Sequence, residues 1–274
     1  MTYQTLITPA ELRALPDALI LDCGFDLSDP AAGERAYAAG HIPGAHYLHL
    51  ERDLSGAKTG PDGAFRGRHP LPERDAFAAL LRRLGLRTGR QVVACDGQGG
   101  MYAARAWWML RWLGHADVAV LDGAWDGERV TAIPAATPSD WQPGEPRAAQ
   151  VDAATLQARL GRVRLIDARA PERFRGDVEP LDRQAGHIPG ARNRFFRDNL
   201  GADGRFKPAA QLRQEFGALL APHAAHEVVH QCGSGVTACH NLLAMVHAGF
   251  AEPQLYPGSW SEWSADPARP IATA

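Results

Sequence analysis

One seven-residue segment occurs twice in this sequence. Ala39-Gly40-His41-Ile42-Pro43-Gly44-Ala45 recurs letter for letter at residues 185–191. Shorter landmarks repeat around it in the same order: Leu21-Asp22 matches Ile166-Asp167, Val92-Val93 matches Val228-Val229, and Gly123-Ala124-Trp125 matches Gly258-Ser259-Trp260. Ordered landmarks of this kind predict one folding unit that is encoded twice, and a chain of 274 residues is long enough for two domains with a core each.

Both copies alternate short apolar runs with stretches of helical spacing. The apolar runs, which suit buried parallel strands, lie at residues 18–21, 92–94, 118–121, 163–166 and 228–229. The stretches with apolar residues at helical spacing lie at 72–85, 101–113, 208–220 and 237–248. Strands that alternate with helices predict an α/β fold, with two tandem domains that are each a parallel sheet covered by helices on both faces.

The boundary between the copies is marked by composition. Residues 131–150 contain four prolines and few apolar side chains, which is typical of a linker. We therefore expect an N-terminal domain at 1–135, a linker at 136–150 and a C-terminal domain at 151–274. The spacing of the landmarks also places about ten additional residues in the first copy, between Ala45 and Gln91.

Charge and cysteine content exclude several classes of protein. Lys plus Arg is 29 and Asp plus Glu is 31, so the net charge of −2 gives nucleic acid or an anionic membrane surface no electrostatic reason to bind. No apolar run reaches the ~18 residues that a membrane span needs, and the first residues lack the pattern of a signal peptide, so we expect a cytoplasmic protein. Four cysteines at irregular spacing are too few for a disulfide framework. If a cysteine has a function, we expect it to act as a thiol.

The two copies differ most after the strand at 228–229. The first copy continues as Ala94-Cys95-Asp96, whereas the second reads His230-Gln231-Cys232-Gly233-Ser234-Gly235-Val236-Thr237. An open α/β sheet binds its ligand at the carboxyl ends of its strands, where this loop would lie. Gly233 and Gly235 allow the loop N–H groups to turn inward beside the positive end of the following helix. Such a cradle stabilises a thiolate and predicts Cys232 as a nucleophile.

The sequence gives less support to other functions of Cys232. A zinc site of His230, Cys232, Cys239 and His240 has suitable ligand types but lacks paired metal-ligand spacing, so we expect no metal. Cys232 and Cys239 are not spaced as a C-x-x-C redox pair, although a regulatory disulfide between them stays open. A phosphatase loop would need an arginine where Ala238 stands, because phosphoryl oxygens need a guanidinium.

The repeated histidines have a simpler interpretation. A histidine between glycine and Ile-Pro-Gly is most often a turn residue whose imidazole bonds nearby backbone, and the segment occurs in both copies whether or not a reactive group accompanies it. We therefore expect a structural role for His187 and, in the absence of other signals, for His41.

Several motifs together resemble one known family. They are the paired Gly-His-Ile-Pro-Gly-Ala segments, Trp107-Trp108, Gly114-His115, Leu121-Asp122-Gly123, Arg173-Phe174-Arg175-Gly176, Cys232 to Thr237 and Gly258 to Trp263. Over essentially its whole length the chain resembles the tandem-domain rhodanese-type sulfurtransferases and is most similar to the 3-mercaptopyruvate sulfurtransferases. The loop Cys-Gly-Ser-Gly-Val-Thr is the form that the family associates with mercaptopyruvate.

The resemblance implies which residues act. In this family the second domain carries a persulfide-forming cysteine, here Cys232, and the first domain is silent, in agreement with Asp96 at the matching position. The resemblance further implies a persulfide held by the loop at Gly233, Gly235, Val236 and Thr237, donor binding by Arg173 and Arg183, and help from Ser234 and from His41 and Asp29 of the first domain. It assigns Trp260 to the wall of the site, although a role in the core is equally compatible.

The resemblance also implies the partners. The donor would be a small molecule, and the acceptor would be cyanide, a small thiol or a thioredoxin-like protein, with no cofactor. Two alternatives stay open. One is a thiosulfate:cyanide sulfurtransferase that uses the same Cys232. The other is a non-catalytic sulfur-binding or partner-docking module, against which the intact cysteine loop argues.

Overall fold

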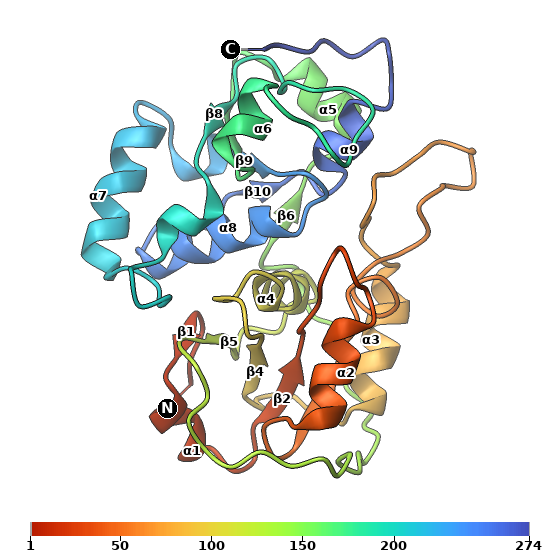
Figure 1. Cartoon of the computed structure of the whole chain (residues 1–274), viewed down its shortest axis with the longest axis vertical. Coiled ribbons are helices and arrows are strands. Elements are labelled where there is room, and N and C mark those ends of the chain that lie inside the picture. Colours follow the sequence, from red (N-terminus) through yellow and green to blue (C-terminus); the bar gives the residue numbers. More distant parts are fainter. Residues whose placement is uncertain (1, 274) are drawn as a thin grey trace. The chain divides into compact units, whose positions relative to one another are not determined.

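The computed structural model describes residues 2–273 and divides into two compact units (Figure 1). Unit 1 comprises residues 2–56, 72–147 and 202–205, and unit 2 comprises 57–71, 148–201 and 206–273. Each unit therefore consists mostly of one half of the sequence. Each also contains a short segment from the other half, residues 202–205 in unit 1 and 57–71 in unit 2. The domain boundaries expected from the sequence do not separate these two segments.

Each unit is built on a five-stranded parallel sheet, so the predicted α/β class is confirmed. In unit 1 the strand order is β1 (Leu6–Ile7), β5 (Val118–Leu121), β4 (Val92–Cys95), β2 (Leu19–Asp22) and β3 (Ala45–Tyr47). In unit 2 it is β6 (Ala149–Gln150), β10 (Gln254–Leu255), β9 (Val228–Gln231), β7 (Arg164–Asp167) and β8 (Arg192–Asn193). The order is equivalent in the two units, as the sequence repeat requires.

The helices connect these strands. Unit 1 contains α1 (Pro9–Arg13), α2 (Ala32–Ala39), α3 (Arg74–Arg83) and α4 (Ala103–Trp112). Unit 2 contains α5 (Ala153–Ala158), α6 (Pro171–Arg175), α7 (Ala209–Leu220), α8 (Thr237–His247) and α9 (Ser259–Trp263), with 3-10 turns η1 (Phe196–Asn199) and η2 (Ala225–Glu227). Helix α4 packs on β4 and β5, and α8 packs on β9 and α7 (Figure 1). The four long helices agree with the predicted stretches of helical spacing.

The mostly apolar sequence of α4 fits its buried position. Every residue of α4 is buried, and Trp107 and Trp108 are fully inaccessible. A helix without a polar face is stable only when neighbours cover it on all sides. Among the described residues, no helix is long and apolar enough to cross a membrane.

The expected linker packs on unit 1 over part of its length. Ser139 N–H donates to the Arg82 carbonyl (3.0 Å) and Gly144 N–H donates to the Leu113 carbonyl (2.9 Å). Trp141 between them is only 6% exposed. These bonds fasten the end of the proline-rich segment to the helices α3 and α4.

Each half of the sequence has a loop of similar form, and each loop belongs at least in part to the unit built by the other half. Each is closed by an isolated antiparallel bridge, Thr59 with Phe65 in the first half and Leu200 with Phe206 in the second. Residues 57–71 nevertheless belong to unit 2, and residues 202–205 belong to unit 1. The additional residues of the first copy thus complete the second unit rather than the first.

Candidate active site

Cys232 lies where the sequence predicts, directly after the central strand β9 and before α8. The start of α9 holds this loop. Cys232 N–H donates to Ser259 Oγ (3.1 Å), Trp260 N–H donates to the Cys232 carbonyl (3.0 Å), and Ser261 N–H donates to the Gly233 carbonyl (2.9 Å). Cys232 is 2% exposed, so its thiol sits in a closely packed, hydrogen-bonded loop.

The two glycines of the loop have different tasks. Gly235 has φ +76°, and a Cβ there would lie 2.3 Å from the Pro257 carbonyl oxygen, so both backbone conformation and space require glycine. A Cβ at Gly233 would instead lie 2.9 Å from Nη2 of Arg68 and 3.4 Å from Nη1 of Arg173. Gly233 therefore leaves room for two guanidinium groups beside the cysteine loop.

In the equivalent loop of unit 1, backbone N–H groups bind an anionic side chain. The Asp96 carboxylate at the first position of this loop accepts four backbone N–H bonds, from Gln98 (2.8 Å), Gly100 (2.9 Å), Tyr102 (2.8 Å) and Ala103 (2.9 Å). The loop amides thus converge on a negative group that the chain itself supplies. In unit 1 this cradle is filled by Asp96, whereas in unit 2 the corresponding side chain is the thiol of Cys232.

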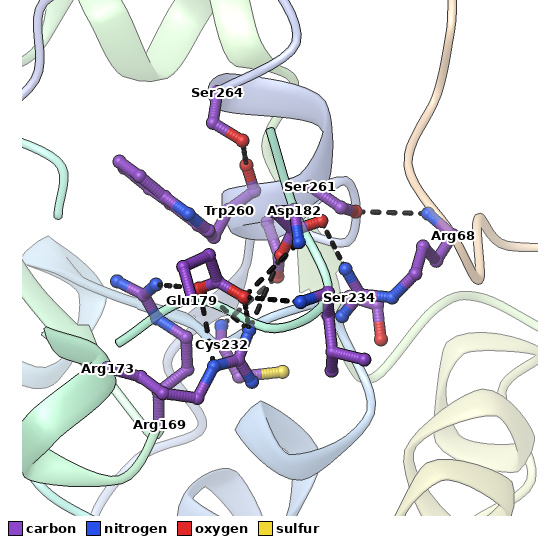
Figure 2. Close-up of polar contacts among 12 residues, drawn as sticks. Arg68, Arg169, Arg173, Glu179, Asp182, Cys232, Ser234, Trp260, Ser261 and Ser264 are labelled. Carbon is purple, nitrogen blue, oxygen red and sulfur yellow. Dashed lines mark hydrogen bonds and ion pairs between the residues drawn. The ribbon is translucent and has the colours of Figure 1, made fainter. Parts of the chain in front are cut away.

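Two carboxylates, those of Glu179 and Asp182, pair with the two arginines beside Gly233. Arg173 Nη2 pairs with Glu179 Oε1 (2.7 Å) and with Asp182 Oδ2 (3.4 Å), and Arg68 pairs with the other oxygen of Asp182 (Figure 2). The Asp182 carboxylate therefore bridges two guanidiniums. Burial raises the pKa of Asp182, while the neighbouring charge of Arg68 opposes that effect. A small external carboxylate would find the same two guanidiniums suitable.

A third arginine, Arg169, shares the carboxylate partner of Arg173. Arg169 is 3% exposed and contacts both oxygens of Asp167, at 2.8 Å for the shortest pair, and also Glu179 Oε2 (3.3 Å). Its guanidinium stands 4.6 Å from the centre of the Trp260 ring. Arg169 thereby fixes Glu179, which in turn holds Arg173.

Ser234 has a histidine partner that the sequence did not reveal. Nδ1 of His69 lies 2.8 Å from Ser234 Oγ, and both residues are buried. His69 and Arg68 come from the 57–71 segment, whose backbone is anchored by a bond from Arg68 N–H to Ser261 Oγ (3.0 Å). The only sequence signal for them is that the first copy is about ten residues longer between Ala45 and Gln91, where both residues lie.

His41 and His187 have the environment expected of turn residues. His41 is fully buried in unit 1, with Nδ1 2.8 Å from the Tyr37 carbonyl oxygen and its ring stacked on Tyr37 at 3.8 Å. His187 repeats this arrangement with Phe174, at 2.8 Å and 4.0 Å. The structure thus gives His41 and His187 equivalent surroundings within their units and places His69 beside Ser234.

The remaining expected residues take no part in the ion pairs that the structure shows for Arg68 and Arg173. Arg183 is exposed and forms no hydrogen bond or ion pair with any residue from 2 to 273. Asp29 is an exposed residue of unit 1 that pairs with Arg35 of α2. Val236 caps α8 and Thr237 begins it, so their N–H groups belong to the first turn, which has no partners within the helix.

The other three cysteines and His230 are buried, each within its own unit. All four cysteines are free, and burial raises the pKa of Cys23 and of Cys95 well above the usual value. Burial also lowers the pKa of His230 to about 3. Within residues 2–273, no three His, Cys, Asp or Glu side chains are grouped as a metal site.

Comparison with known proteins agrees with the repeat. The model of the rhodanese-like domain matches residues 8–127 and again 152–266. The chain is 52% identical to a "Probable 3-mercaptopyruvate sulfurtransferase" of Pseudomonas aeruginosa, over 100% of this chain and 99% of that protein. It is 32% identical to the thiosulfate sulfurtransferase of Gallus gallus, over 89% and 85% of the two chains.

A solved structure shares the architecture. The crystal structure of SseA from Escherichia coli, described as a 3-mercaptopyruvate sulfotransferase with the rhodanese fold, superposes with a TM-score of 0.77 at 28% identity. The match covers 94% of this chain and 100% of that one, so both units take part in it.

Proposed function

Because the chain belongs to the rhodanese-like domain family through both of its halves, we propose that it is a 3-mercaptopyruvate sulfurtransferase with Cys232 as its sulfur carrier. The observation that carries this proposal is the pair of guanidiniums, from Arg68 and Arg173, beside a cysteine loop. A thiol donor that bears a carboxylate fits such a site, because the guanidiniums bind its anionic end while its sulfur faces Cys232.

The first half of the reaction loads the cysteine. The Cys232 thiolate attacks the donor sulfur, the carbon–sulfur bond breaks, and its electron pair remains on carbon as the enolate of pyruvate. The products are a Cys232 persulfide and, after the enolate gains a proton, pyruvate. The N–H groups of the loop from Gly233 to Thr237 stabilise the negative sulfur, as the loop of unit 1 does for Asp96.

Ser234 and His69 form the proton-handling pair of this step. Their 2.8 Å separation allows the serine hydroxyl to donate to the developing enolate while the imidazole replaces its proton. This role combines the expected Ser234 with a histidine that the fold supplies. We assign it to His69 rather than His41, because His41 is enclosed by Tyr37 and backbone carbonyls.

Donor binding requires a rearrangement of charges. Arg68, Arg169 and Arg173 face Asp167, Glu179 and Asp182, so every guanidinium already has a carboxylate partner. Asp182 is the most replaceable partner, because Arg173 keeps Glu179 and Arg169 keeps Asp167 when Asp182 leaves. We propose that the donor carboxylate takes the place of Asp182 between Arg68 and Arg173, with Arg183 as a solvent-exposed neighbour.

The second half of the reaction unloads the cysteine. The acceptor attacks the outer sulfur of the persulfide, the sulfur–sulfur bond breaks, and the Cys232 thiolate is regenerated. Cyanide would leave as thiocyanate, and a small thiol or thioredoxin-like protein as its own persulfide. Four free cysteines suit a reducing compartment, so we place the protein in the cytoplasm.

Steady-state kinetics with two donors test the proposal. The expected result is a kcat/KM for 3-mercaptopyruvate at least about tenfold above that for thiosulfate, measured with cyanide as the acceptor. A preference for thiosulfate would instead identify a thiosulfate:cyanide sulfurtransferase. Absence of turnover with either donor would leave the non-catalytic module and refute the proposal.

A further inference from the structure

Unit 1 contains a cavity of about 490 Å³ at the carboxyl ends of its strands. Its lining includes Asp22 at the end of β2, Gly24, Gly40, Asp96 and Trp125. This is the size of a site for a small organic molecule. The cavity lies in the half of the protein that carries no candidate nucleophile, so the sulfurtransferase chemistry does not explain it.

Because the two units are repeats, the equivalent region of unit 2 indicates which chemical group the cavity of unit 1 could bind. In unit 2 the corresponding region is filled by the side chain of Arg169, which contacts three groups. It pairs with the Asp167 carboxylate (2.8 Å), donates to the Gly186 carbonyl (2.7 Å) and lies over the Trp260 ring (4.6 Å). A guanidinium therefore satisfies a carboxylate, a carbonyl and an indole in one pocket.

Unit 1 keeps all three partners but lacks the arginine. Asp22 corresponds to Asp167, Gly40 to Gly186 and Trp125 to Trp260 in the repeat, and all three line the cavity. The residue two positions after Asp22, which corresponds to Arg169, is Gly24. Unit 1 thus has the surroundings of a guanidinium with an open space in place of the side chain.

The positive charges of Arg129 and His41 act on the carboxylate in this cavity and lower its pKa. Asp22 is partly buried and accepts a bond from Gly24 N–H (3.0 Å), but it forms no ion pair with any residue from 2 to 273. Burial nevertheless raises the pKa of Asp22, and the nearby Asp96 adds to that effect. A bound cation would relieve both sources of instability.

One arginine lies at the edge of the cavity. Arg129 is exposed and its Nη1 donates to the Gly40 carbonyl (3.1 Å), so it already satisfies one of the three partners. Its charge also acts on Asp22, although the two side chains form no ion pair. The guanidinium of Arg13 already lies over one face of the Trp125 ring, 5.4 Å from its centre. A ligand would therefore occupy the part of the cavity between Asp22 and the other face of this indole.

We propose that this cavity binds a small molecule bearing a guanidinium group, which pairs with Asp22 and lies against Trp125. The planar cation matches a carboxylate by two parallel hydrogen bonds and an indole by cation–π attraction, as Arg169 does in unit 2. This inference does not depend on the chemistry of Cys232, so it stands or fails separately from the proposed function.

Calorimetric titration of the full-length protein with methylguanidinium tests the site. We expect saturable binding in the millimolar range, weakened at least about tenfold in Asp22→Asn, because the mutation removes the charge and keeps the shape. Equal binding by the wild type and Asp22→Asn, or no binding at all, would overturn the proposal.

A second variant supplies the cation within the chain. A Cβ at Gly24 would meet only Asp22 Oδ1, at 3.3 Å, so Gly24→Arg can place a guanidinium in the cavity as unit 2 does. It should abolish methylguanidinium binding and raise the Tm by about 2–4 °C. Gly144→Arg, which adds the same charge in open space, should do neither. If Gly24→Arg folds and still binds methylguanidinium like the wild type, the assignment is wrong.

Sulfur transfer to cyanide serves as the control for folding. Asp22, Gly24 and Gly144 belong to unit 1, whereas Cys232 and its loop belong to unit 2. All three variants should therefore keep the wild-type turnover. A variant that lost both binding and turnover would be misfolded and would be replaced by Gly24→Gln, which fills the same space without a charge and should also lose binding without the rise in Tm.

Discussion

His69 Nδ1 lies 2.8 Å from Ser234 Oγ, although 165 positions separate the two residues in the sequence. The contact exists because the 57–71 segment of the first half packs into unit 2. The same segment carries Arg68 to Asp182. The cysteine loop of the second half is therefore completed by residues of the first half, and its chemistry depends on both.

The serine–histidine contact predicts a coupled loss of turnover. Ser234→Ala and His69→Asn should each lower kcat by about 10²-fold, and the double variant should lose little more, because both residues handle one proton. His41→Asn should leave kcat unchanged and lower the Tm, since His41 bonds the backbone and stacks on Tyr37. Steady-state rates and thermal melts of the four variants measure this. A loss of kcat in His41→Asn with normal activity in His69→Asn would reverse the assignment.

The guanidinium pair predicts an effect on donor affinity. Arg68→Met and Arg173→Met should each raise KM for 3-mercaptopyruvate by about 10- to 100-fold, because each removes a charge-assisted bond to the donor carboxylate. Arg183→Met removes an exposed arginine without a partner and is the matched control. KM values from initial rates decide the matter. Equal effects of Arg68→Met and Arg183→Met would contradict the role of Arg68.

From the position of Asp182 we predict that its substitution lowers KM for the donor, whereas loss of either arginine raises it. Asp182 bridges Arg68 and Arg173 where the donor carboxylate would bind. Asp182→Asn should therefore lower KM for the donor several-fold while leaving kcat nearly unchanged. If Asp182 instead only orients the two arginines, the variant would raise KM, and competition with the donor would be refuted. Inhibition by pyruvate, which carries the same carboxylate, offers a second readout and should become tighter in the variant.

We predict that Glu215 of α7 contributes to the stability of the fold in a pH-dependent way. Its partial burial would raise its pKa, but hydrogen bonds from Arg194, Lys207 and Gln211 outweigh this and lower the pKa to about 2. A lowered carboxyl pKa stabilises the fold at pH above the unfolded value and loses that effect as pH falls through the folded one. Glu215→Gln should cost about 1–3 kcal/mol at pH 7 and about half as much or less at pH 3. Urea unfolding at both values checks this, and an equal cost at pH 7 and pH 3 would contradict it.

The sequence predicted the fold well because the fold depends on local patterns. The apolar run at 118–121 is β5 without change, and the stretch at 237–248 differs from α8 by one residue. Thr8 and Glu11 form a capping box at the start of α1, with both of its hydrogen bonds. Periodicity and capping act over a few residues, so they can be read from the sequence alone.

The site was only partly predictable because two of its residues arrive by long-range packing. Cys232 and Arg173 lie within motifs, whereas Arg68 and His69 lie in a loop whose place is decided by contacts with Ser261 and Gly258. Gly67 has φ +97°, and a Cβ there would lie 2.7 Å from the Gly258 carbonyl oxygen, so that packing needs a glycine. No periodic pattern encodes such docking.

The central claim is that Cys232 carries a sulfur atom taken from the donor. Intact-protein and peptide mass spectrometry after exposure to 3-mercaptopyruvate measures it directly. The account predicts a gain of one sulfur, ~32 Da, on Cys232 alone, reversed by cyanide and absent from Cys232→Ser, whose melting curve should stay that of a folded protein. No gain in the wild type, or a gain of the same size in Cys232→Ser, would contradict it.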